Sequence, residues 1–195
     1  LLDRSLTSFG GKGVFTKELE EALLREEIDL AVHSAKDMPM EFPEGLGIGA
    51  VLSRADVRDV LVTTSGTRAA DLAPGSVVGT SSLRRELQIK EINPLVKIRL
   101  LRGNVQTRLR KLKEGQYDAI LLAAAGLERL GITEEDGICL EYLEPDTFLP
   151  AAGQGILAVE SKEGRLTEVL QSIHCPEAAL ELGAGRRFRE ARSLC

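Results

Sequence analysis

The chain has 195 residues, of which 43% are hydrophobic and 28% are charged, a composition typical of a globular protein and not of a disordered one. A formal net charge of −5 argues against nonspecific binding to nucleic acid, and no apolar run reaches the roughly 20 residues that a membrane span needs. Three scattered cysteines are too few for a disulfide framework, and none lies at metal-ligand spacing from a histidine, so we expect no metal site.

The first residues, LLDRSLTSFGGKG, do not have the basic-then-apolar pattern of a secretion signal, which favours a cytoplasmic protein. The chain does not begin with methionine, so an organellar leader before it stays open. We also expect a monomer without nucleic-acid or membrane partners.

Helical and strand-like patterns alternate along the chain. The first block is expected to contain one helix and then two strands, at residues 16–25, 29–33 and 48–52. The second block opens with a strand at 57–63 and a short helix at 67–72.

Three strand-then-helix units follow in the second block. They are VVGTSSLRRELQIKEI (77–92), VKIRLLRGNVQTRLRKLKEG (96–115) and YDAILLAAAGLERLG (117–131). Apolar strands joined by helices favour mainly parallel sheets covered on both faces. Residues 156–160 resemble a strand that returns to the first block, and the chain is helical from Cys175 onward.

These patterns predict an α/β protein of two lobes, with the second lobe inserted into the first. Residues 1–55 and 150–173 are assigned to domain 1, residues 56–149 to domain 2, and residues 174–195 to the start of a third domain. A ligand is expected in the cleft between the lobes, outside the carboxyl ends of the strands.

Polar and basic residues follow the predicted strand ends. They are Ser34, Lys36 and Asp37 after the first strand, Thr80, Ser82, Arg84 and Arg85 after the fourth, then Arg102, Asn104 and Arg108, and finally Arg129. The carboxyl ends of parallel strands share one edge, where helix N-termini already favour anions, so five arginines there predict a site for several carboxylates or phosphates. Taken alone, any one of these arginines is better explained as part of a solvated helix face. We expect Arg110, Lys111 and Lys113 to form such a face.

Several of these positions have a second interpretation. One hydroxyl of Thr80 to Ser82 is expected to cap a helix, and Asn104 is a plausible cap of the next. The loop Gly10 to Gly13, with Lys12, is either a plain turn or a mobile loop at the mouth of the cleft. His33, which ends an apolar strand, fits a buried core histidine better than a catalytic base.

Asp37 stands out because a carboxylate would oppose the binding of an anionic substrate. It could be a surface residue or an ion-pair partner of Lys36. The functional interpretation is that a cation forms during the reaction and that Asp37 stabilises it.

Together these segments resemble a known family. GGKGVFTKELE, DLAVHSAKDMP, GTSSLRR, LLRGNVQTRL, DAILLAAAGLERL and LPAAGQG are similar to successive motifs of the porphobilinogen deaminases, in the family's order and spacing, between Gly10 and Gly155. The resemblance implies three domains, of which the first two resemble type 2 periplasmic binding proteins. It also implies a dipyrromethane cofactor, made from two porphobilinogens and attached by a thioether to a cysteine of domain 3.

The resemblance further implies a role for each matching residue. Asp37 matches the catalytic aspartate, with Lys36 beside it, and Lys12 matches a loop lysine over the cleft. The residues that match cofactor and substrate carboxylate contacts are Arg84, Arg85, Arg102, Arg108, Arg129, Ser34, Thr80 and Ser82. The implied reaction joins four porphobilinogens into the linear tetrapyrrole hydroxymethylbilane with release of ammonia, in porphyrin and haem biosynthesis.

The chain departs from the family pattern at both ends. An N-terminal TRxSxLA-type motif is absent, and nearly all of domain 3 is absent. GRRFREARSLC has Gly185 where the family has Glu and no Gly-Gly pair before Cys195, which falls just short of the expected attachment position. Cys195 is therefore only a candidate for cofactor attachment, and Cys139 and Cys175 are expected to be inert thiols. The alternative function is a non-catalytic, two-lobed anion-binding module.

Overall fold

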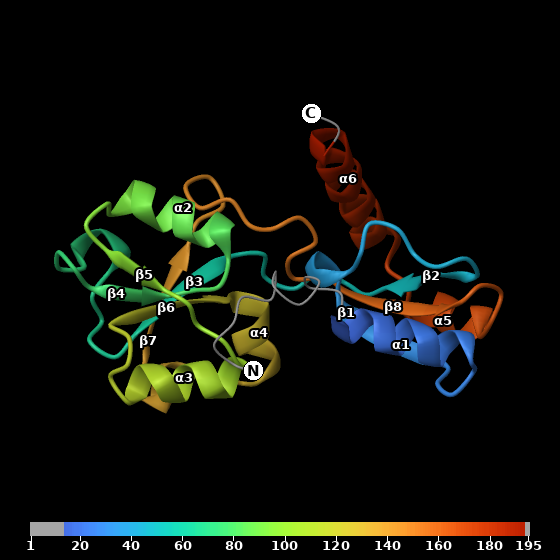
Figure 1. Cartoon of the computed structure of the whole chain (residues 1–195), viewed down its shortest axis with the longest axis horizontal. Coiled ribbons are helices and arrows are strands. Elements are labelled where there is room, and N and C mark those ends of the chain that lie inside the picture. Colours follow the sequence, from blue (N-terminus) through green and yellow to red (C-terminus); the bar gives the residue numbers. More distant parts are fainter. Residues whose placement is uncertain (1–13, 194–195) are drawn as a thin grey trace. The chain divides into compact units, whose positions relative to one another are not determined.

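The computed structural model describes residues 14–193, with side chains from residue 16 to residue 187. The chain divides into two compact units, which we call unit 1 (Leu1–Ala55 and Ala152–Cys195) and unit 2 (Asp56–Ala151). Figure 1 shows that each described unit combines helices with a sheet, so the α/β class expected from the sequence is confirmed.

The sheet of unit 1 has three described strands in the order β1-β8-β2. They are β1 (Leu30–Ser34), β8 (Leu157–Lys162) and β2 (Leu46–Val51), and β8 runs antiparallel to both neighbours. The expectation of a mainly parallel sheet is wrong for these strands. The physical reason is that the central strand does not arrive through a helical crossover, since it returns only after the whole of unit 2.

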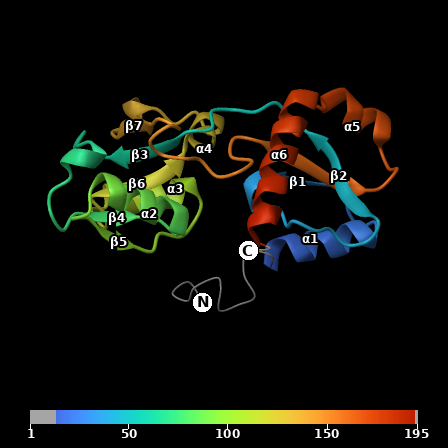
Figure 2. The same ribbon diagram turned by 90° about the horizontal axis from the view of Figure 1, so that it is seen from above.

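Helices cover both faces of this sheet. Helix α1 (Val14–Leu24) packs Leu23 against β1 and β2, and α6 (Pro176–Ser193) packs Leu182 against β2 and β8. Helix α5 (Thr167–Ile173), which the sequence did not predict, covers the other face with Leu170. Figure 2 shows α1 and α5 on opposite sides of the strands.

A glycine lets α5 approach β2 closely. The pairing of β2 with β8 shifts register between Ile48 and Ala50, and Gly49 lies at that bulge. A Cβ atom on Gly49 would lie 2.5 Å from Oγ of Ser161 and 2.6 Å from Cδ1 of Leu170. Only glycine fits there without displacing the helix.

The sheet of unit 2 has the order β5-β4-β6-β3-β7. These strands are β3 (Asp59–Thr63), β4 (Val77–Gly79), β5 (Lys97–Arg99), β6 (Ala119–Ala123) and β7 (Cys139–Leu143). Strands β5, β4 and β6 are parallel, as expected, whereas β3 is antiparallel to both β6 and β7. The expectation of a mainly parallel sheet therefore holds for three strands of this unit. Residues 64–76, which carry no α-helical crossover, join β3 to β4 and leave β3 free to run the other way.

The helices of unit 2 are α2 (Leu83–Ile92), α3 (Val105–Lys113) and α4 (Ala124–Arg129). The first two begin with the predicted caps. Ser82 accepts a hydrogen bond from the backbone N–H of Arg85, and Asn104 accepts one from Thr107. The short helix expected at 67–72 is a 3-10 turn, η4 (Ala69–Asp71), and β7 was not predicted.

Candidate functional site

The carboxyl ends of β5, β4 and β6 lie at one edge of the unit 2 sheet. The backbone pairing continues past β4, since the N–H of Thr80 donates to Arg99 (3.2 Å) and the N–H of Leu101 donates to Thr80 (3.3 Å). Thr80 and Ser82 therefore lie beside the segment that leads into Arg102, as the strand pattern predicted.

The two hydroxyl groups after β4 also organise the start of α2. Thr80 is buried, and its Oγ1 accepts a hydrogen bond from the N–H of Ser82 at 3.1 Å. Ser82 Oγ caps the helix through the N–H of Arg85 at 3.5 Å. Both hydroxyls act here as acceptors, so each keeps an O–H that can donate to an anion.

Arg85 is directed into unit 2. Its side chain is 9% exposed and pairs with Asp59, whose side chain is fully buried. Nε and Nη2 of Arg85 donate to Oδ1 of Asp59 at 2.9 and 2.6 Å, and Nη1 donates to the carbonyl of Leu121 at 3.0 Å. The charge of Arg85 is thus matched within the protein.

Arg84 shares the same carboxylate but reaches the surface. Its Nη2 lies 2.6 Å from Oδ2 of Asp59, Nη1 donates to the carbonyl of Leu149, and the side chain is 26% exposed. The guanidinium carbon lies 5.9 Å from the ring centre of Phe148. Two arginines and one aspartate leave one net positive charge, on the partly exposed Arg84.

Three further predicted arginines lie on other elements of unit 2. Arg102 follows β5 and is half-buried, and its carbonyl accepts from Nζ of Lys111 at 3.2 Å. Arg108 on α3 donates through Nε to the carbonyl of Gly103 at 2.7 Å. Arg129 is exposed in the last turn of α4. Lys111 therefore does not belong to a purely solvated face.

Arg110 and Lys113 lie on the solvated face of α3, as expected. Both side chains are exposed, and Nη1 of Arg110 pairs with Glu114 one turn later at 2.7 Å. This makes Arg110 a suitable control for arginines that face the strand ends.

In unit 1, Ser34 ends β1 and the next three residues form the 3-10 turn η3 (Ala35–Asp37). Ala35 is buried, and Nζ of Lys36 donates to Oε1 of the fully buried Gln154 at 3.2 Å. Asp37 is exposed at the end of the turn. The turn is therefore anchored through its first two residues and presents the carboxylate of the third.

His33 lies in the interior, as its place at the end of an apolar strand indicated. Its Nε2 lies 2.9 Å from Oε2 of Glu160, and the two side chains are 9% and 0% exposed. Nε2 of His33 and both carboxylate oxygens of Glu160 are buried, and none of these three atoms has a hydrogen-bond partner among the residues that the structure describes. Burial raises the pKa of Glu160 to about 7, with a smaller contribution from the charge of Glu20, and burial lowers the pKa of His33.

Two predicted site residues, Lys12 and Cys195, lie outside the described residues. Cys139 and Cys175 are free thiols. Over the described part of the chain, no three His, Cys, Asp or Glu side chains are grouped to hold a metal ion. Within residues 14–193, no helix has the length and apolar character needed to cross a membrane.

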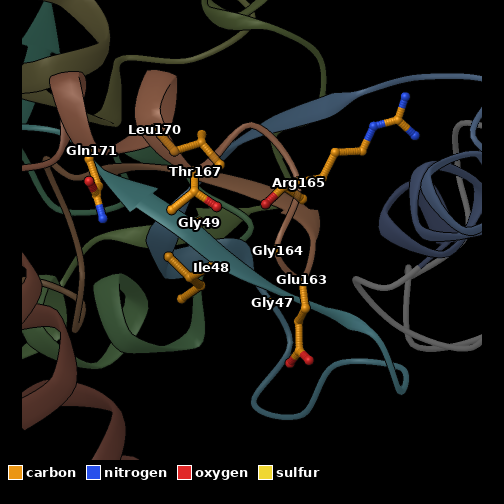
Figure 3. A pocket seen from close by; sticks show the side chains of 10 residues that line it. Gly47, Ile48, Gly49, Glu163, Gly164, Arg165, Thr167, Leu170 and Gln171 are labelled. Atoms are coloured by element: carbon orange, nitrogen blue, oxygen red, sulfur yellow. The ribbon is translucent and has the colours of Figure 1, made fainter.

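A pocket of about 420 Å³ lies on the α5 side of unit 1 (Figure 3). It is lined by β2, β8 and α5 and includes Gly47, Gly49, Ser161, Arg165 and Gln171. The guanidinium of Arg165 points away from the two glycines and pairs with Glu26 and Asp29 at 3.2 and 3.0 Å. None of the site residues predicted from the sequence lines this pocket.

Comparison with known families decides the relationship. The family model "Porphobilinogen deaminase, dipyromethane cofactor binding domain" matches residues 1–169. The chain belongs to the porphobilinogen deaminase family. Porphobilinogen deaminases of known sequence agree with this assignment over nearly the whole chain.

The porphobilinogen deaminase of Syntrophobacter fumaroxidans is 50% identical over 188 residues, which cover 95% of this chain and 60% of that protein. The enzyme of Exiguobacterium sibiricum is 51% identical over 176 residues, with 89% of this chain and 56% of that protein covered. The chain thus spans about 60% of the length of these porphobilinogen deaminases.

Solved structures with more distant sequences are also similar to this chain. One is a periplasmic binding protein of Salmonella typhimurium with high arginine specificity, at 15% identity and a TM-score of 0.46, covering 86% of this chain and 76% of that one. Another is the periplasmic VFT2 domain of Bordetella pertussis BvgS, at 18% identity and a TM-score of 0.46, covering 87% and 72%.

The sequence analysis did not identify the buried polar residues that contact Arg85, Lys36 and His33. Asp59, Gln154 and Glu160 are fully buried polar side chains that contact Arg85, Lys36 and His33. Each lies in or beside an apolar strand, where a polar residue is unusual enough to indicate a buried partner. That signal was present, but it does not name the partner.

Proposed function

We propose that the complete protein is a hydroxymethylbilane synthase, which joins four porphobilinogens and releases ammonia, and that this chain supplies most of its first two domains. The observation that carries the proposal is the exposed carboxylate of Asp37 on an anchored turn, in a chain of the porphobilinogen deaminase family that also has Arg84 and Arg102 after the ends of β4 and β5. A simple receptor for anions would not benefit from that carboxylate.

The residues after β4 fit the dipyrromethane cofactor that the family carries. Its acetate and propionate groups need hydrogen-bond donors, and Thr80, Ser82 and Arg84 keep donors at the start of α2. Arg102, Arg108 and Arg129 would serve the carboxylates of the cofactor and of the growing chain. When bound, the cofactor supplies the pyrrole to which substrate units are added.

Asp37 is the proposed catalytic residue. Loss of ammonia from porphobilinogen breaks the bond between the aminomethyl carbon and nitrogen, and the electron pair leaves with nitrogen. The pyrrole is then left as an electron-poor azafulvenium cation. A fixed carboxylate that accepts hydrogen bonds from pyrrole N–H groups stabilises this cation and can assist proton transfer. Lys36, held by Gln154, keeps the turn in place.

The test is Asp37→Asn in the complete protein, which keeps the size of the side chain and removes its charge. We expect kcat to fall by about 10²–10³-fold with a smaller change in KM. Glu41→Gln, a neutralised and exposed carboxylate on the following loop, should leave both unchanged. A normal kcat in Asp37→Asn, with normal cofactor mass, would contradict the assignment.

We further propose that the complete protein works as a cytoplasmic monomer without nucleic-acid or membrane partners. The net charge of −5 supports the absence of nucleic acid. Light scattering during size-exclusion chromatography tests the monomer, and a dimer mass at micromolar concentration would overturn it.

A further inference from the structure

Helix α6 packs directly against the turn that carries Asp37. Leu182 of α6 is buried in one cluster with Ala35 of the turn and with Met38, which follows it. Gly153 lies in the same contact, because a Cβ atom added there would lie 3.0 Å from Leu182 and 3.2 Å from the backbone nitrogen of Lys36. Apolar packing against α6 thus fixes Ala35, the first residue of the turn, and Met38, the residue directly after the turn.

Arg186 lies one helical turn after Leu182 and reaches the segment that follows Asp37. Its Nη2 donates to the backbone carbonyls of Pro39 and Met40, both at 2.7 Å. Its guanidinium carbon lies 5.4 Å from the ring centre of Phe42. A single cationic nitrogen therefore holds two consecutive carbonyls of this segment.

The segment between η3 and β2 depends on such contacts because it has little regular structure of its own. Residues 38–45 lie between η3 and β2 and contain no helix or strand. Its backbone carbonyls have no strand or helix partners, so they need hydrogen-bond donors from other parts of the protein. A hydrogen bond from a charged donor is stronger than one from a neutral donor. The position of the Asp37 carboxylate is then set from both sides, by Lys36 before it and by Arg186 after it.

We infer that Arg186 is a positioning residue for Asp37, which it holds at the orientation needed for reaction without touching the substrate itself. The inference rests on the proposed catalytic role of Asp37. Its physical basis is that displacing a catalytic group by about 1 Å can reduce turnover by as much as 10²-fold.

The experiment compares three variants of the complete, cofactor-loaded protein. Arg186→Met keeps the length and packing of the side chain but removes both hydrogen bonds, and kcat should fall about ten- to a hundredfold with KM changed much less. Arg187→Met is the matched control, since Arg187 is the next residue on α6 and is exposed, and its kcat should stay normal. Arg186→Lys should recover a large part of the activity, because one nitrogen makes both bonds and an ammonium group can replace it.

A second measurement does not depend on activity. Hydrogen exchange of the amides at 36–42 should speed up in Arg186→Met and not in Arg187→Met, whereas exchange within β8 should stay the same in both. Normal kcat in Arg186→Met overturns the inference if Asp37→Asn, assayed in parallel, is impaired. If Asp37→Asn is itself fully active, the proposed function fails and the inference falls with it. Equal exchange at 36–42 in Arg186→Met and the unaltered protein also overturns the inference.

Discussion

Arg85 and Asp59 form a buried ion pair in which one carboxylate oxygen accepts two hydrogen bonds from the same guanidinium group, at 2.9 and 2.6 Å. The family pattern groups Arg84 and Arg85 together as carboxylate-binding residues. Their surroundings are different, because Arg85 is buried and its donors are used within unit 2, while Arg84 is partly exposed. The two arginines should therefore respond differently to substitution.

Arg85→Met should destabilise the protein by about 1–3 kcal/mol, because it leaves one oxygen of the buried Asp59 and the carbonyl of Leu121 without their hydrogen-bond donor, while Arg84 still balances the charge of Asp59. The double variant Arg85→Met/Asp59→Leu removes both buried charges and should recover much of that loss. Urea unfolding of the complete protein measures both. An unchanged midpoint in Arg85→Met would show that its charge is not buried in solution.

Arg84→Met should leave the unfolding midpoint nearly unchanged and weaken binding of the carboxylated substrate or cofactor. Loss of one charge-assisted hydrogen bond costs about 1.5–3 kcal/mol, which corresponds to roughly tenfold or more in affinity. Arg110→Met on the solvated face of α3 is the control and should bind normally. Equal losses in the two variants would remove Arg84 from the binding site.

The pair of His33 and Glu160 should make opposing contributions to the pH dependence of stability. Burial raises the pKa of Glu160 to about 7 and lowers the pKa of His33. Stability changes with pH only where the folded and unfolded states bind different numbers of protons. Glu160 binds protons more readily in the folded state and His33 binds them less readily, so the two contributions offset each other.

Single substitutions should expose each contribution. In His33→Gln only Glu160 remains, and its raised pKa gives stability that is present below about pH 4.5 and lost as pH rises through 7. In Glu160→Gln only His33 remains, and its lowered pKa makes stability fall as pH drops below about 6.5. Urea midpoints between about pH 5 and 7 should therefore slope in opposite directions, and parallel slopes would contradict the pairing.

Gly153→Ala should be more damaging than Gly164→Ala. Both glycines have positive φ, +76° and +75°, so both substitutions carry the same backbone strain of about 1–3 kcal/mol. A Cβ atom on Gly164 meets open space, whereas one on Gly153 would press on Leu182 and on the backbone of Lys36. The difference between the two variants in melting temperature and in kcat measures the effect of this contact alone. Equal values would show that the turn shifts to accommodate the added Cβ atom.

Much of the fold could be predicted from the sequence because apolar runs and helix caps are local features of the chain. Apolar runs marked β1, β2, β3, β6 and β8, and the caps Ser82 and Asn104 lie where helix propensity placed them. Strand β7 (CLEYL) was missed because a charged residue interrupts it, and α5 because its helical segment is only seven residues long.

The direction of β3 could not be predicted from the sequence, and for this reason Asp59 was not recognised as a partner of the residues that begin α2. If β3 ran parallel to β6, its first residue, Asp59, would lie at the edge of the sheet opposite the carboxyl ends of the parallel strands. Because β3 is antiparallel to β6, Asp59 pairs with Ala123 and lies at the edge where α2 begins. Strand direction depends on long-range pairing, which periodicity does not report.

The position of β8 has a consequence for synthesis of the protein. Unit 2 is one continuous stretch of chain, but the sheet of unit 1 places β8 between two strands that are translated long before it. On the ribosome, β1 and β2 emerge before β8, the strand that pairs with both of them in the described sheet, and the whole of unit 2 is made in between. Unit 2 can therefore complete its core first, and the nascent strands of unit 1 expose edges that a chaperone can protect until β8 arrives.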